Sequence, residues 1–301
     1  MRHRDHPGLV LDFAPYTPFM EPRTARPPGL SPIDPADWTV VLPDFAAQMA
    51  YRQALLARRR EIVLAELPEA RPAAEELLTA LLAHLATRAD YRVEPRSVRR
   101  PDGGAVALGG APLETAGRLV AEDLVLMEAD AASGEYRLSA GFLCFPARWL
   151  LSEKLGRPLT AIHTPVPDYD ETLARRVNRV FEAIRPGRPL CRVNWLVYAT
   201  PEPHLPLGHE EKAGRPPPDA CGAARLYLRT ERQTLRRLPQ TGAVAFGIKT
   251  SICPVEALAP ATAAGLRAAL SRLDPETVAY RAGGDLHART LARLDGLAGA
   301  P

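Results

Sequence analysis

Hydrophobic side chains in the first half of the chain recur at helical spacing. Residues 44–67 place them three or four positions apart, after an aspartate of the kind that often caps a helix. Residues 72–88 repeat the pattern and open on proline, which a first turn tolerates because its missing N–H has no helical partner there. We predict helices over both segments and over residues 113–129.

In the second half of the chain, the spacing of the hydrophobic side chains changes from helical to every second residue. The segment 190–199, L-C-R-V-N-W-L-V-Y-A, alternates between two sets of side chains, as strands do. Few strand–helix–strand repeats are available to build a parallel sheet, so we expect an α+β fold with an antiparallel sheet and flanking N- and C-terminal helices. The predicted strands are 135–145, 190–199, 224–233 and 242–250, and the further helices are 149–155, 170–184, 255–273 and 276–297.

Residues 1–43 differ from the rest of the chain because prolines are frequent and apolar periodicity is weak. We interpret them as an extended N-terminal arm that wraps the surface or meets a partner. Residues 44–301 are expected to form a single domain. The Pro-rich, polar stretch 201–218 is predicted to be a surface loop.

The charge balance and the missing motifs exclude several classes of protein. The formal net charge of +3 is too small to indicate nucleic-acid binding, and no basic stripe with interleaved aromatic residues is present. No apolar run of about 18 residues suggests a membrane span, and the first residues lack the apolar core of a signal peptide. A cytoplasmic protein is therefore expected. The sequence lacks G-x-G-x-x-G after a strand and G-x-x-x-x-G-K-[ST], the familiar motifs of nicotinamide, flavin and nucleotide sites. If the protein does redox chemistry, we expect its electrons to come through another polypeptide.

The segment 161–170, A-I-H-T-P-V-P-D-Y-D, is the densest in candidate chemistry. His163 follows two apolar residues and precedes two prolines, which stiffen the backbone beyond the imidazole. A rigid loop with apolar flanks suits a single histidine ligand to a metal, whose second ring nitrogen is aimed at a partner. The alternative is a histidine satisfied by a backbone carbonyl in an ordinary loop. Zinc is disfavoured because no H-x-x-x-H or H-E-x-x-H spacing is present.

Residues 225–250 are predicted to form a hairpin that is crowded with charged and amide side chains. Arginine binds carboxylates in a planar, bidentate way, so this hairpin could hold an acidic cofactor or partner. The alternative is a solvated face with internal Arg–Glu pairs. Lys249 stands out because it lies within an otherwise apolar strand. The candidate residues are Arg229, Glu231, Arg232, Gln233 and Lys249.

The strand at 190–199 adds two polar residues to this set. Arg192 and Asn194 are two positions apart, so they share one face of the strand, while Trp195 lies on the other face. The preceding segment 141–149, G-F-L-C-F-P-A-R-W, would supply an apolar wall. Walls of this kind suit a flat macrocycle.

Together, four segments carry a resemblance. They are L-S-A-G-F-L-C-F-P-A-R-W at 138–149, K-L-G-R-P-L-T-A-I-H-T-P-V-P-D-Y at 154–169, R-V-N-W at 192–195, and R-T-E-R-Q-T-L-R-R-L-P-Q-T-G-A-V-A-F-G-I-K-T at 229–250. In this order the chain resembles the haem-binding (alpha) subunit of the haem-dependent oxidative N-demethylases. The resemblance extends over residues 18–291.

The resemblance implies a PAS-like antiparallel sheet that holds haem b, with one axial protein ligand to the iron. It implies oxidative removal of a methyl group from a small secondary amine, such as dimethylamine, with O₂ as oxidant and formaldehyde as product. Electrons would come from a separate flavin/iron–sulfur reductase subunit. This chain shows no such module in its sequence.

By matching motifs, the resemblance implies His163 as the axial iron ligand, and Arg229, Arg232 and Gln233 as contacts to the haem propionates or the substrate. Glu231 would attract an ammonium substrate, and Lys249 would line the pocket or pair with a propionate. Arg192 is a further cofactor-binding candidate. Two other functions stay open: a haem-binding sensor of PAS type, and a haem-free interaction subunit.

Overall fold

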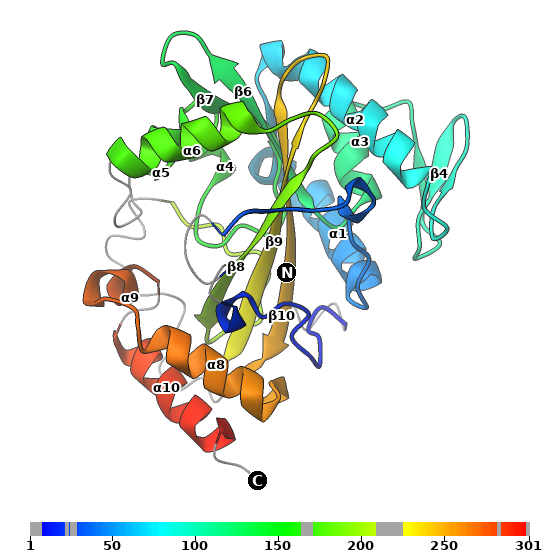
Figure 1. Cartoon of the computed structure of the whole chain (residues 1–301). Coiled ribbons are helices and arrows are strands. Elements are labelled where there is room, and N and C mark those ends of the chain that lie inside the picture. The colour runs from blue at the N-terminus through cyan, green and yellow to red at the C-terminus, as the bar shows by residue number, and fades with distance from the viewer. Residues whose placement is uncertain are drawn as a thin grey trace.

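A computed structural model of the chain describes residues 8–21, 24, 29–163, 171–208, 225–281 and 284–298. Its centre is a seven-stranded sheet in the order β1-β8-β9-β10-β6-β7-β2, and every neighbouring pair is antiparallel (Figure 1). The α+β prediction is confirmed. The strands are β1 Ser31–Pro32, β2 Leu64–Glu66, β6 Asp123–Asp130, β7 Glu135–Phe142, β8 Leu190–Tyr198, β9 Tyr227–Arg237 and β10 Val244–Pro254.

The β9–β10 hairpin is the longest ladder of the sheet. It pairs Tyr227 with Pro254 at one end and Arg237 with Val244 at the other, without a register shift. Gly242 has a φ of 73° in the connecting turn, a conformation that glycine adopts at little cost. The carboxylate of Glu76 accepts hydrogen bonds from the backbone N–H groups of Gln240 and Thr241 and fixes the turn. Both strands were predicted, although each is longer than expected.

The helix predicted over residues 113–129 is wrong beyond Leu119. Helix α3, Pro112–Leu119, ends there, and Asp123–Asp130 forms strand β6. Strand β6 lies between β10 and β7, and an apolar cluster covers each of its faces, with Leu124 and Leu126 in one and Val125 and Met127 in the other. Its apolar residues therefore do not alternate with polar ones. A short apolar run of this kind cannot be distinguished from a buried helix by periodicity alone.

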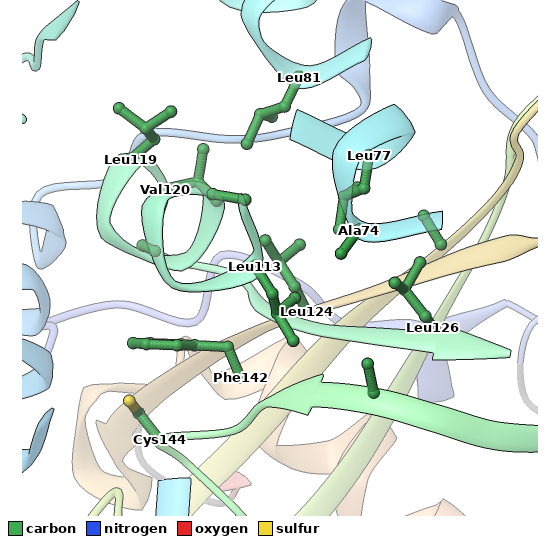
Figure 2. Close-up of a cluster of buried hydrophobic side chains, with 14 of the residues drawn as sticks. Ala74, Leu77, Leu81, Leu113, Leu119, Val120, Leu124, Leu126, Phe142 and Cys144 are labelled. Carbon is green, nitrogen blue, oxygen red and sulfur yellow. The ribbon is translucent and has the colours of Figure 1, made fainter. Parts of the chain in front are cut away.

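One face of the sheet, here called the packed face, is covered from end to end. Helices α1 Phe45–Val63, α2 Arg71–Leu85 and α3 lie over one half of it. Figure 2 shows leucines of α2 and α3 meeting Leu124 and Leu126 of β6 and Phe142 of β7. Helices α8 Pro260–Leu270 and α10 Gly284–Ala298 cover the other half in a second apolar cluster.

On the opposite face, here called the half-open face, the apolar cluster formed by the described residues covers one part of the sheet. Helices α4 Leu151–Lys154, α5 Leu159–His163 and α6 Glu171–Ala183 lie there (Figure 1). Arg237 of β9 anchors the end of α6, because its guanidinium donates to the carbonyl oxygens of Phe181 and Ile184. The middle of this face carries polar side chains from β8 and β9.

Several smaller elements differ from the sequence-based expectations. Residues 276–297 were predicted as one helix, but they contain α9, Pro275–Arg281, and most of α10. Residues 91–107 include a small three-stranded sheet of β3 Arg92–Val93, β4 Ser97–Arg99 and β5 Ala105–Ala107. In the predicted surface loop, Pro201, Pro203 and Gly208 are buried, so its described part is wrongly predicted, while 209–218 lie outside the described residues.

The N-terminal arm, where described, is short turns and extended chain. Its backbone joins the sheet at two points, through β1 beside β8 and through the Leu11 N–H, which donates to the Ile252 carbonyl. Phe19, in the turn Pro18–Met20, packs edge-on against Trp195 of β8. Burial of such aromatic side chains holds the arm to the packed face.

Candidate functional site

His163 is the last residue of α5 and is half-buried. Its Nδ1 lies 2.8 Å from the carbonyl oxygen of Leu159. Because a carbonyl can only accept, Nδ1 carries the proton and Nε2 carries the lone pair. Burial lowers the pKa of His163 to about 4, and the charges of Lys154 and Arg192 act in the same direction. The imidazole is therefore neutral near pH 7, which is the form that binds a metal.

Helix α5 is positioned by contacts on two sides. Leu159 and Ile162 are buried in the apolar cluster of the half-open face. The backbone N–H and hydroxyl of Thr160 both donate to the carboxylate of Glu135, where β7 begins. His163 was predicted in a stiff loop and instead ends a short helix, and the prolines predicted to stiffen the chain lie in 164–170, outside the described residues.

Four polar side chains of β8 and β9 lie together in the middle of the half-open face. Arg192 pairs in register with Gln233, and Asn194 with Glu231, so the four project from one face of adjacent strands. The amide groups of Asn194 and Gln233 approach one carboxylate oxygen of Glu231 at 3.4 and 3.3 Å. Arg229 donates to the other oxygen at 3.1 Å. Glu231 is thus an oriented carboxylate with two long, weak contacts.

Arg192 is the least satisfied cation of this group. Within the described part of the chain, its guanidinium makes no hydrogen bond or ion pair. Burial lowers its pKa, and the carboxylate of Glu231 works against that shift. The charge of Arg192 also reaches His163. A half-buried guanidinium of this kind can hold a carboxylate by two parallel hydrogen bonds.

Arg229, in contrast, is completely engaged by the protein. It is 1% exposed and donates to the carbonyl oxygens of Pro203 and Phe145, in addition to Glu231. The predicted contact with a cofactor would require some of these bonds to break. Its observed contacts join β9 to the segments that follow β7 and β8.

Lys249 and Arg232 lie on the packed face, away from the other predicted site residues. They pair with each other in register, one on β10 and one on β9. The ammonium of Lys249 is 0% exposed and donates to both carboxylate oxygens of Asp44, at 3.0 and 2.9 Å. Burial lowers the pKa of Lys249, and Asp44 opposes that shift. Arg232 donates to the carbonyl oxygens of Asp37 and Trp38.

His204 is a half-buried histidine that sequence reasoning missed. Its Nδ1 lies 2.8 Å from the carbonyl oxygen of Cys144, so Nε2 carries the lone pair. That Nε2 is buried and has no hydrogen-bond partner among the residues that the structure describes. The flanking prolines of P-E-P-H-L-P were the available signal, because they fix the backbone around the ring.

The described residues fit one kind of metal centre better than another. No group of three or more His, Cys, Asp or Glu side chains in the described ranges could hold a bare metal ion. The iron of a haem receives four nitrogens from its macrocycle and needs only one histidine from the protein. A neutral imidazole within the electrostatic reach of a guanidinium has the chemistry to meet the iron and a carboxylate of that cofactor. Gln233 and Phe246 lie on central strands and are half-buried among the described residues.

The protein has an α+β fold, and the half-open face of its sheet carries a neutral histidine within the electrostatic reach of an arginine. Residues 29–290 match the family described as haem-dependent oxidative N-demethylase, alpha subunit-like, and the chain belongs to this family. The family resemblance drawn from the four sequence segments is confirmed. The description indicates haem dependence, oxidative N-demethylation and membership of a multi-subunit enzyme. In the described residues, no helix is long and apolar enough to span a bilayer.

Proposed function

We propose that this chain is the haem b-carrying subunit of an enzyme that oxidises the N-methyl group of a small secondary amine with O₂ and releases formaldehyde. The observation that carries the proposal is His163, neutral and with its Nδ1–H fixed by the Leu159 carbonyl, within the electrostatic reach of Arg192. The family description supports the haem and the reaction type in general terms. The sheet would act as a PAS-like platform whose half-open face holds the macrocycle.

In this proposal each residue of the site has a separate role. His163 binds the iron through Nε2, and the Leu159 carbonyl sets the orientation and basicity of the ring. Arg192 pairs with a propionate, because its guanidinium has no hydrogen-bond partner in the described chain. Gln233 and Phe246 form the floor beside the macrocycle. When bound, the haem supplies the oxidising chemistry, which protein side chains lack.

Glu231 is proposed to hold the substrate. A secondary amine is protonated near pH 7, so a positioned carboxylate attracts it and fixes the methyl group relative to the cofactor. Arg229 anchors one carboxylate oxygen of Glu231, and the long contacts of Asn194 and Gln233 can yield to a better donor. Lys249 and Arg232 have no part in the site, because they are bonded to groups on the packed face.

The proposed enzyme needs an electron donor. Haem chemistry with O₂ requires reduction of the iron, and the sequence contains no dinucleotide-binding motif. A separate flavin/iron–sulfur reductase subunit is therefore proposed, in agreement with a family description that names an alpha subunit.

The proposal is tested by reconstituting the full chain with haem and recording its absorbance spectrum. The wild-type protein should give a Soret band that shifts on titration with dimethylamine. His163→Ala should lose the band or change it to that of a differently ligated haem. His84→Gln is the control, because His84 is buried near Thr39, on the packed side.

Two results would contradict the assignment. An unchanged spectrum in His163→Ala would exclude His163 as the ligand, and a changed spectrum in His204→Gln alone would transfer the ligand role to His204. Absence of any Soret band in the wild-type protein would exclude haem binding altogether.

A further inference from the structure

Five exposed arginines lie on α6 and the turn that follows it. Arg179 follows Arg175 by four positions and Arg176 by three, so the three exposed arginines share the outer side of the helix. Arg185 and Arg188 face each other across the next turn, where the Arg188 N–H donates to the Arg185 carbonyl. We call these five residues the α6 arginine patch.

Among the residues that the structure describes, the arginines of the patch are not paired with acidic side chains. Within the described ranges, none of the five guanidinium groups makes an ion pair or a side-chain hydrogen bond. Glu182 is an exposed acid on the same helix, and the nearby carboxylate of Glu135 is occupied by Thr160. Like charges at helical spacing destabilise a helix by about 0.2–0.5 kcal/mol per pair, so the cluster is tolerated rather than used for folding.

The inner side of α6 places the patch close to the proposed haem ligand. Phe181 is buried and packs against Tyr136 with the rings tilted by 45° and their centroids 5.2 Å apart, and Arg237 fixes the last turn. Helix α6 also packs against α5, which ends at His163. An α-helix with its side chains is about 10 Å across, so the patch lies roughly one helix diameter outside this region.

We propose that the α6 arginine patch is the docking surface for an acidic partner protein that donates electrons to the haem. The electron-donating role of the partner rests on the function proposed above. Charge complementarity steers such encounters, and the position of α6 brings a docked donor near the cofactor.

Two other polyanions fit the patch less well. A bilayer-binding helix needs an apolar face to insert, and the apolar side of α6 is already buried against the sheet. Single-stranded nucleic acid is held by exposed aromatic side chains as well as by charge. The large exposed hydrophobic residues in the described chain are Phe13, Met20 and Tyr280, none of which lies on α6.

The test uses the full chain and a reduced acidic [2Fe–2S] ferredoxin as the probe. The triple variant Arg175→Glu/Arg176→Glu/Arg179→Glu should lower the association rate about tenfold or more at low ionic strength. The difference should shrink to less than about twofold in 0.5 M salt, where charges are screened. A matched control reverses Arg58, Arg96 and Arg99, exposed residues on and near α1 and β4, well away from α6 (Figure 1). The control should bind like the wild type.

Binding is measured by surface biosensor on both apo and haem-loaded protein, and haem reduction is followed separately by stopped flow. Dithionite, a small reductant that needs no docking, should reduce all three proteins equally. If ferredoxin binds the apo chain through the patch but no haem can be loaded, the docking surface stands and the haem function fails. Equal loss in the triple and control variants would overturn the proposal. So would tight binding of phosphatidylserine vesicles or DNA with none of ferredoxin.

Discussion

The two faces of the sheet use neighbouring residues of the same strands in opposite ways. On β9, Arg232 points to the packed face, whereas Glu231 and Gln233 point to the half-open face. The packed-face charges are buried and held by close partners: Lys249 by Asp44, and Arg52 by Asp123 at 2.6 Å. On the half-open face, Arg192 has no bonded partner within the described chain, and two contacts of Glu231 exceed 3.2 Å.

This contrast shows how the same residue types can serve folding or ligand binding. A buried charge with good partners is costly to expose but gives nothing to a ligand, because its hydrogen-bonding capacity is already used. A half-buried charge without such partners contributes little to the fold and keeps its capacity for a ligand. The degree of satisfaction, and not the residue type, separates Arg192 from Arg232 and Lys249 on the packed face, and also from Arg229 on its own face.

The largest expected effect is on the packed face. Lys249→Met leaves the Asp44 carboxylate buried without its cation, which typically costs about 3–5 kcal/mol. The double variant Lys249→Met/Asp44→Leu removes both charges and should recover much of that loss. Urea unfolding of the apo protein measures each free energy. A double variant no more stable than the single one would show that the pair does not act as a unit.

A second pair of variants compares one arginine from each face. Arg192→Gln should speed haem dissociation about tenfold and leave the free energy of unfolding within about 0.5 kcal/mol, because its guanidinium has no bonded partner in the described chain. Arg232→Gln should do the reverse. It leaves two backbone carbonyls, those of Asp37 and Trp38, without a donor, at a cost of about 1–3 kcal/mol.

Haem dissociation is measured by transfer to apomyoglobin, and stability by urea titration. If Arg232→Gln released haem faster than Arg192→Gln at equal stability, the assignment of the two faces would be reversed.

Much of the fold could be predicted because it depends on local pattern. The alternation in 190–199 predicts β8, and the helical spacing in 72–88 predicts α2 within a few residues. Strand β6 could not be predicted in this way, because a strand covered on both faces loses its alternation. Helix α5 was also missed, since five residues are too few for a periodic signal.

The candidate site was less predictable than the fold. Alternate residues of a strand point to opposite faces, so the sequence of β9 already separates Arg232 from Glu231 and Gln233. The sequence-based hypothesis grouped all three because the sequence does not show which face of the strand is covered. The partner of Lys249 is Asp44, about 200 positions earlier in the chain, and only the folded structure brings them together. His163 could be selected from its motif, but the carbonyl that fixes its tautomer depends on α5.

The last comparison concerns pH, and it uses one histidine from each side of the sheet. Burial lowers the pKa of His84 and of His163 to about 4, whereas both titrate near 6.5 in the unfolded chain. Between these values the unfolded state binds protons that the folded state does not. The free energy of unfolding is therefore full above about pH 6.5, falls as the pH drops to about 4, and levels below that. Each histidine contributes at most about 1.4 kcal/mol per pH unit.

Urea titrations of the apo protein at several pH values should show this slope, and His84→Gln and His163→Gln should each remove part of it. If His163 is the iron ligand, iron and proton compete for its Nε2. Added haem should then change the part of the pH dependence of unfolding that comes from His163 and leave the part from His84 unchanged. An equal response of both variants to haem would mean that the cofactor does not distinguish the two faces.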